Sequence, residues 1–93
     1  MIEQETQWTQ DQDTHDDMVR FCKYYITYNQ TYCLAVTKVE SKPYYTMFLR
    51  DGNPTGNEYY RLKFNPYNHD DIQEALFKAD KHTRRYLLQE LLQ

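Results

Sequence analysis

The sequence predicts an α+β fold in the order α-β-β-β-α, a three-stranded antiparallel meander with two helices packed on one face. Apolar residues recur at helical spacing near both ends of the chain. Between them lie three short runs rich in aromatic and β-branched residues, separated by turn residues. The connections are too short for crossovers, which favours antiparallel pairing. A chain of 93 residues is expected to form one domain.

Residues 1–13 are expected to form an acidic, flexible arm that precedes a single α+β domain over residues 14–93. The first 17 residues carry six carboxylates and no Lys or Arg, whereas the remaining 76 carry eleven basic and eight acidic residues. The acidic arm precedes a mildly basic body, and we expect it either to occupy a nucleic-acid site on a partner protein or to fold over the basic face and compete with nucleic acid there. The candidate binding residues of the arm are Glu3, Glu5, Asp11 and Asp13.

The first helix is predicted over about residues 15–28, with Thr14 as its N-cap. The Asp16-Asp17 pair would lie in the first turn, where the helix dipole favours anions. The predicted apolar stripe consists of Met18, Phe21, Cys22, Tyr25 and Ile26.

Three strands are predicted next, over residues 32–39, 44–50 and 58–64. The segment ESKP joins the first two, and DGNPTG, which holds both glycines, joins the last two. The side-chain period of two couples the faces of paired strands. We expect residues whose numbers sum to 83 to pair across the first two strands, and those summing to 109 across the last two.

This register places two different sets of side chains on the two faces of the sheet. The core face would carry Leu34, Val36, Tyr45, Met47, Leu49, Tyr60, Leu62 and Phe64. The open face would carry rings and cations, with Phe48 opposite Arg61, Arg50 opposite Tyr59 and Thr46 opposite Lys63. The candidate partner-binding residues of the open face are Tyr44, Phe48, Arg50, Tyr59, Arg61 and Lys63.

The last helix is predicted from about Asp70 to Leu92, with Asn68 as its N-cap. Its inner stripe would be Ile72, Leu76, Ala79, Thr83, Tyr86, Leu87 and Leu91. Leu88 and Leu92 widen the apolar surface beyond what packing on one sheet face needs. Together with Arg84 they form a candidate dimer patch.

The order α-β-β-β-α resembles the topology of the double-stranded-RNA-binding domain over about residues 15–92. That family places basic residues at the start of its second helix to bind phosphates across a groove. The corresponding residues here are Asn68, His69, Asp70 and Asp71, a stretch with two carboxylates and no Lys or Arg. The resemblance is therefore one of topology alone, and the acidic residues at this position argue against RNA binding of that kind.

No motif indicates catalysis, a metal or a cofactor. The sequence has no Gly-rich phosphate loop, no G-x-S-x-G and no H-E-x-x-H. The segments THDDM and NHDDI are explained as helix caps, and Cys22 and Cys33 as small buried thiols. Because these motifs are absent, we expect that the protein is not an enzyme. We also expect it to be cytoplasmic, because no secretory signal or membrane helix is evident.

Three functional hypotheses follow from these features. The first is a small, tyrosine-rich protein-binding module, similar in general character to accessory and inhibitor proteins of phages and mobile elements, including anti-CRISPR proteins that block a host nucleic-acid machine. The second is a module that binds single-stranded nucleic acid on the open face, where rings would stack bases and cations would meet phosphates. The third is a structural subunit that forms a homodimer through the C-terminal helix.

Overall fold

The computed structural model describes residues 2–11, 17–53, 55–65 and 71–91. Six strands and one helix make up this described part: β1 (Ile2–Glu5), β2 (Thr9–Gln10), β3 (Met18–Thr27), β4 (Thr31–Val39), β5 (Tyr45–Asp51), β6 (Glu58–Phe64) and α1 (Ile72–Leu91). The α+β class is confirmed. The predicted three-stranded meander with two helices is wrong, because one antiparallel six-stranded sheet carries a single described helix.

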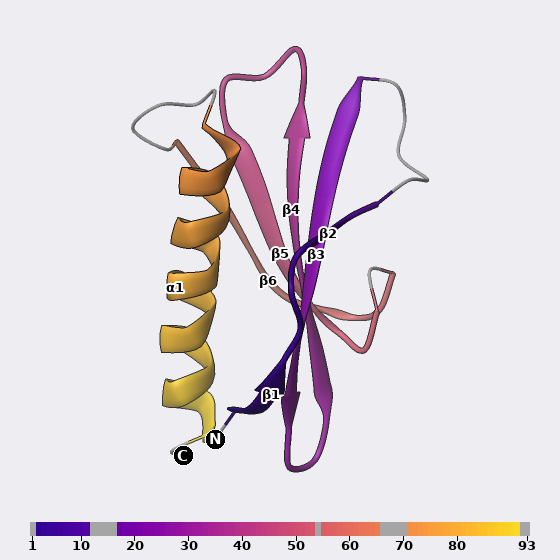
Figure 1. Ribbon diagram of the computed structural model, residues 1–93, viewed down its shortest axis with the longest axis vertical. Helices are drawn as coiled ribbons and strands as arrows, with labels where there is room; N and C mark the ends of the chain where they lie inside the picture. The colour runs from indigo at the N-terminus through magenta and orange to yellow at the C-terminus, as the bar shows by residue number, and fades with distance from the viewer. Residues whose placement is uncertain (1, 12–16, 54, 66–70, 92–93) are drawn as a thin grey trace.

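The sheet follows the order β1-β3-β4-β5-β6, and β2 also pairs with β3. Helix α1 runs along one face of this sheet, as Figure 1 shows. The helix contacts β4 and β5, two neighbouring strands of the sheet interior. Strand β6 lies at one edge, and the short strands β1 and β2 line the other edge.

The helix predicted over residues 15–28 is replaced by β3, which pairs with β4 from Met18 opposite Val39 to Ile26 opposite Thr31. The spacing of the apolar residues predicted a helix wrongly because both faces of this strand are buried. Cys22 points to one face and Tyr25 to the other, so apolar residues recur at a spacing that also fits a helix. The run YYIT has high β propensity, and pairing with β4 satisfies its backbone.

The N-terminal arm contributes two strands to the sheet. Ile2 pairs with Thr27 and Glu5 with Tyr25, and a register irregularity follows Ile2. Strand β2 pairs with the middle of β3, where Thr9 lies opposite Cys22. Trp8 packs against the main core between these two pairings, so the arm is anchored by an aromatic side chain as well as by backbone hydrogen bonds.

The predicted register is confirmed for β4, β5 and most of β6. Leu34 pairs with Leu49, Met47 with Leu62, and Phe48 with Arg61. All eight residues predicted for the core face belong to the main core or pack against it. Their side chains meet α1 through Ala75, Leu76, Ala79 and Leu87, among others.

Helix α1 begins close to its predicted position. The Asp71 carboxylate accepts hydrogen bonds from the backbone N–H groups of Gln73 (3.1 Å) and Glu74 (3.3 Å), so Asp71 caps the helix. The predicted caps Thr14 and Asn68 lie outside the described residues. No helix in the described ranges has the length and apolar character that crossing a membrane requires.

No described helix covers the second face of the sheet, which we call the open face. Its centre holds small side chains, Cys22, Cys33 and Ala35, that are almost fully buried. Larger neighbours shield them, since Ala35 pairs with Phe48 and Cys33 pairs with Tyr24 on one side and Arg50 on the other. A second, thin apolar layer therefore lies under an exposed rim of rings and cations.

Candidate functional site

The open face is hollowed at the end where β5 begins and β6 ends. A groove of about 300 Å³ is lined by apolar, hydroxyl and cationic side chains, among them Met18, Val39, Tyr44 and Phe48. Among the residues that the structure describes, the charged ones that line it are Lys42, Arg61 and Lys63, all of them cations. The groove is thus suited to a negatively charged group that also offers some apolar surface.

The Phe48 ring lines this groove and contacts two guanidinium groups. Arg50 lies 4.6 Å and Arg61 lies 4.7 Å from the ring centroid, measured from the guanidinium carbon. Such cation–π contacts are worth about 0.5–1 kcal/mol at exposed sites. A base that stacked on Phe48 would have to compete with these two contacts.

Tyr44 also lines the groove and lies close to two ammonium groups. Lys42 Nζ is 5.7 Å and Lys63 Nζ is 5.0 Å from the ring centroid. Hydrogen bonding to Lys42, together with the charges of both lysines, lowers the pKa of the Tyr44 hydroxyl. The two lysines therefore concentrate positive charge around a single phenol at the mouth of the groove.

The prediction that Tyr59 pairs with Arg50 is wrong, because a register irregularity after Leu49 places Glu58 opposite Arg50. The Tyr59 ring instead packs 5.4 Å from the ring of Tyr32, a residue of the helix-side core. Its hydroxyl accepts a hydrogen bond from the Gln30 amide, at 3.2 Å. The bulge thus separates Tyr59 from the other five candidate residues of the open face.

Two carboxylates offset part of the positive charge on this face. Glu58 forms an ion pair with Arg61 at 2.9 Å, and this hydrogen-bonded contact lowers the pKa of Glu58 and raises that of Arg61. Asp11 forms an ion pair with Arg20 nearer the other edge. Lys42 and Lys63 belong to neither of these pairs and line the groove beside Arg61.

The candidate residues of the acidic arm do not form one surface. Glu3 is exposed, whereas Glu5 forms ion pairs with Lys23 (2.7 Å) and Arg84. Asp11 pairs with Arg20, and Asp13 lies outside the described residues. At least two of these carboxylates are therefore engaged within the molecule.

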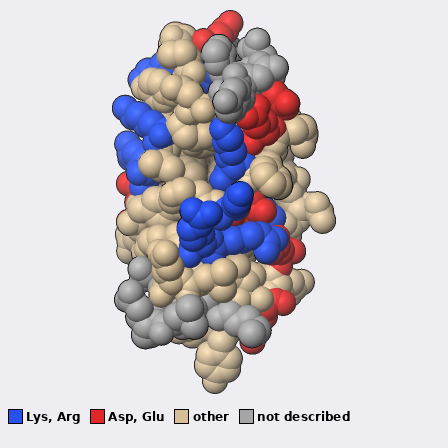
Figure 2. Space-filling view, turned by 90° about the vertical axis from the view of Figure 1, so that its left-hand side faces the viewer, with Lys and Arg blue, Asp and Glu red and all other residues tan. Residues whose placement is uncertain are grey.

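The candidate dimer patch is divided in a similar way. Leu88 is 52% exposed on the outer side of α1, but Leu92 lies outside the described residues. The Arg84 guanidinium pairs with Asp80 at 3.1 Å and with Glu5, so it is directed toward the sheet edge. Figure 2, which faces the α1 side, shows Lys and Arg atoms gathered across its middle. The exposed cations of the helix are Lys78, Lys81, Arg84 and Arg85.

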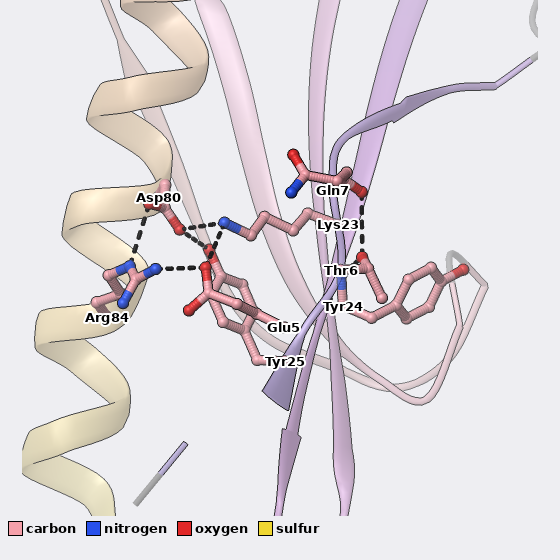
Figure 3. Close-up of polar contacts among 8 residues, drawn as sticks. All are labelled: Glu5, Thr6, Gln7, Lys23, Tyr24, Tyr25, Asp80 and Arg84. Atoms are coloured by element: carbon pink, nitrogen blue, oxygen red, sulfur yellow. Dashed lines mark hydrogen bonds and ion pairs between the residues drawn. The ribbon is translucent and has the colours of Figure 1, made fainter. Parts of the chain in front are cut away.

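A cluster of five polar residues joins β1, β3 and α1, and sequence reasoning did not find it. Lys23 Nζ lies 2.7 Å from Glu5 and 3.0 Å from Asp80, while the Tyr25 hydroxyl donates a hydrogen bond to Asp80 (Figure 3). Arg84 bridges the two carboxylates from the outer side. We call Glu5, Lys23, Tyr25, Asp80 and Arg84 the polar clamp.

Burial and pairing have opposite effects on the acid of the polar clamp. Burial alone would raise the pKa of Asp80, but hydrogen bonds from Tyr25, Lys23 and Arg84 outweigh it and leave the pKa lowered. Burial, reinforced by Asp80, raises the pKa of the Tyr25 hydroxyl. The clamp is therefore a mutually satisfied polar cluster with a structural role, and none of its residues lines the open-face groove.

The two cysteines are free thiols on the open-face side of the sheet, as expected for buried residues. They occupy diagonal positions on β3 and β4, since Cys22 pairs with Ala35 and Cys33 with Tyr24. A hydrogen bond with Cys33 lowers the pKa of Cys22, and the same contact raises the pKa of Cys33. The pair lies beneath the rim of the open face, beside Arg50 and Tyr24.

Neither a protein-family model, nor a curated protein, nor a solved structure matches this chain.

Proposed function

We propose that this protein is a small, non-enzymatic protein-binding module whose open-face groove receives a carboxylate-bearing segment of a partner. The observation that carries this proposal is the lining of the groove. Lys42, Arg61 and Lys63 surround a hollow whose walls are the half-buried rings of Tyr44 and Phe48. Aromatic and arginine side chains are enriched at protein interfaces, and a carboxylate entering this groove would meet Lys42, Lys63 and Arg61, although Glu58 offsets part of the charge of Arg61.

The stacking contacts favour a protein partner over a single-stranded nucleic acid. Base stacking requires a free aromatic face, and each base stacked on a ring contributes about 1–3 kcal/mol. Two guanidinium groups lie 4.6 and 4.7 Å from the Phe48 ring centroid and would compete with a base for this ring, and Tyr59 packs against Tyr32. Glu58 also offsets the charge of Arg61, which weakens any run of phosphate contacts along β6. The narrower hypothesis of a phage-encoded inhibitor stays a prediction.

Site-specific photo-crosslinking tests this proposal. A photoreactive p-azidophenylalanine replaces Tyr44 in the groove or, as a matched control, Tyr28, which is 91% exposed in the turn between β3 and β4. The full chain is irradiated in cells, and the adducts are treated with protease or with nuclease. We expect a discrete adduct from position 44 that protease removes and that position 28 does not give.

A charge reversal shows whether the groove itself makes the contact. Lys63→Glu in the Tyr44 crosslinker background places a carboxylate where the partner's carboxylate would bind, so the adduct should disappear. Lys81→Glu makes the same charge change on the outer side of α1 and should leave the adduct intact. An adduct that nuclease removes, an adduct that survives Lys63→Glu, or no adduct from position 44 would each contradict the proposal.

A further inference from the structure

Strand β6 presents an unpaired edge. It is the last strand in the sheet order, and within the described ranges no strand pairs with its outer side. With seven residues it is longer than β1 and β2, which line the opposite edge. Every second residue of an edge strand directs its N–H and C=O groups outward, so β6 is a template for an additional strand.

An apolar pocket lies beside this edge on the helix side. It has a volume of about 200 Å³ and is lined by Met47, Leu62, Phe64 and Ala79, together with Lys78 and His82. A dry cavity of about 150 Å³ holds a benzene ring, so this pocket has room for one large apolar side chain. Leu62 and Phe64 are successive helix-side positions of β6, which places the pocket directly along the edge.

Cations lie on both sides of the path that an added strand would take. Arg61 and Lys63 project from β6 on the open side, and Lys78 projects from α1 on the helix side. The helix flank that faces β6 is identified by the Tyr60 ring, which contacts His82 at 5.7 Å and Tyr86 at 4.6 Å between centroids. A peptide running between these groups would be most stable if it carried carboxylates.

The same charges disfavour a second copy of this chain as the occupant. Antiparallel pairing of two β6 strands would bring Arg61 and Lys63 of both copies onto one face of the joined sheet. Like charges on neighbouring strands are destabilising, and lysine on an edge strand is a common protection against such pairing. An acidic strand avoids this repulsion and gains attraction instead.

We propose that β6 accepts an extended acidic segment of a partner protein as an additional strand, with one apolar side chain in the helix-side pocket and alternate carboxylates facing Arg61 and Lys63. Because side chains alternate along a strand, the recognised segment alternates apolar and acidic residues. This inference shares Arg61 and Lys63 with the groove contact but goes beyond it, since it also rests on the backbone edge of β6 and on the pocket on the opposite face of the sheet.

Fluorescence anisotropy with a defined peptide tests strand addition. The probe is a fluorescein-labelled peptide of about eight residues, the usual length of a strand, that alternates Val and Glu. The control has the same composition with the Val and Glu residues in separate blocks. We expect the alternating peptide to bind the full chain and the block peptide to bind at least about tenfold more weakly, because only the former directs every Val toward one face.

Backbone methylation separates strand addition from contacts made by side chains alone. Two versions of the peptide carry N-methyl groups on alternate amides. In one version the methylated amides lie along one edge of the extended peptide, and in the other they lie along the opposite edge. Only one edge of the added strand bonds to β6, so one version should lose about tenfold or more in affinity while the other binds nearly as well as the parent. Equal binding by both versions, or no binding of the alternating peptide, would overturn the proposal.

Matched charge variants locate the peptide on the helix side. Lys78→Glu should weaken binding about fivefold, whereas Lys81→Glu, on the outer side of the helix, should change it by less than about twofold. Equal effects of the two variants would contradict the assigned edge. Lys78 does not line the open-face groove, so Lys78→Glu leaves the Tyr44 crosslink unaffected, and failure of one proposal is distinguishable from failure of the other.

Discussion

Lys23 Nζ lies 3.0 Å from the Asp80 carboxylate and joins the middle of β3 to the middle of α1 across 57 positions of sequence. The lysine side chain is only 9% exposed, so its charge depends on its partners instead of on water. Glu5, from β1, supplies the second carboxylate. One buried cation therefore fixes the helix and the N-terminal strand to the same point of the sheet (Figure 3).

Replacement of the acid that holds this cation should destabilise the fold. Asp80→Asn removes one of the two carboxylates that face Lys23 and weakens the acceptor of the Tyr25 hydroxyl. Breaking a buried ion pair costs about 3–5 kcal/mol. Because the Asp80 side chain is 21% exposed and Glu5 still faces Lys23, we expect the free energy of unfolding to fall by about 2 kcal/mol. Urea unfolding at neutral pH measures the change.

Asp71→Asn is the matched control for this substitution. It makes the same chemical change on the same helix, but asparagine caps a helix nearly as well as aspartate, so the expected cost is about 0.5 kcal/mol. Similar losses of stability in the two variants would show that the polar clamp contributes no more than an ordinary surface carboxylate.

The pH dependence of stability should report the same acid. Hydrogen bonds lower the pKa of Asp80 in the folded protein despite its burial, while the unfolded chain has an ordinary aspartate with a pKa of about 3.9. A carboxyl group whose pKa is lower in the folded than in the unfolded protein stabilises the fold at pH values above its unfolded-state pKa. This stabilisation is lost as the pH falls through the pKa of the folded protein.

Urea midpoints between about pH 5 and pH 3 should therefore fall more steeply for the natural chain than for Asp80→Asn. The other carboxylates titrate in both proteins, so the difference between the two curves isolates Asp80. Parallel curves would contradict the assignment of a lowered pKa to this residue.

The glycines of the turn between β5 and β6 should respond differently to alanine. Gly52 has a φ of +75° and open space around its Cα, so Gly52→Ala pays for the left-handed backbone alone, about 1 kcal/mol. A Cβ on Gly56 would overlap with the carbonyl oxygen of Asp51, which is backbone and cannot rotate away. We expect Gly56→Ala to cost about 3 kcal/mol.

Thermal or urea unfolding of the two alanine variants gives this comparison directly. Gly52→Asn provides a further check, because asparagine tolerates the left-handed region better than alanine does and should recover part of the loss. Equal destabilisation at positions 52 and 56 would mean that the turn relaxes around the added methyl group.

Local patterns predicted the central part of this fold because its pairings are close in sequence. Strands β4, β5 and β6 are joined by short turns, and alternation fixes which side chains share a face, so Leu34 and Leu49 could be paired in advance. The same reasoning placed the rings and cations on the open face. This reasoning did not predict the bulge at Glu58, since nothing in EYYRLKF indicates an extra residue.

The elements that the sequence did not predict depend on distant partners. The stripe from Met18 to Ile26 fits a helix and a strand buried on both faces, and pairing with β4 decides between them. Lys23 is an ordinary surface residue on a helix but a buried cation on β3. Its partners Glu5 and Asp80 lie at opposite ends of the chain, so no local signal could reveal the polar clamp.

The buried thiols give the last prediction, which concerns their order of reaction. A hydrogen bond with Cys33 lowers the pKa of Cys22, assisted by the nearby charge of Arg20, and the same bond raises the pKa of Cys33. The thiolate is the reactive form of cysteine, and Cys22 is also the more exposed of the two, at 5% against 0%. Brief treatment with iodoacetamide between about pH 7 and pH 9 should therefore alkylate Cys22 first, as peptide mass spectrometry would show.

Two variants of Cys33 separate the hydrogen bond from simple exposure. Cys33→Ala removes the donor, so the pKa of Cys22 should return toward its ordinary value and its alkylation near neutral pH should slow severalfold. Cys33→Ser keeps a donor of similar size and should preserve the faster reaction. Because both substitutions remove the same sulfur atom, any loosening of the sheet affects them alike. Equal alkylation rates of Cys22 in the two variants, or earlier alkylation of Cys33 in the natural chain, would contradict the prediction. Either result would show that solvent access to the thiols, and not their hydrogen bond, decides which cysteine reacts first.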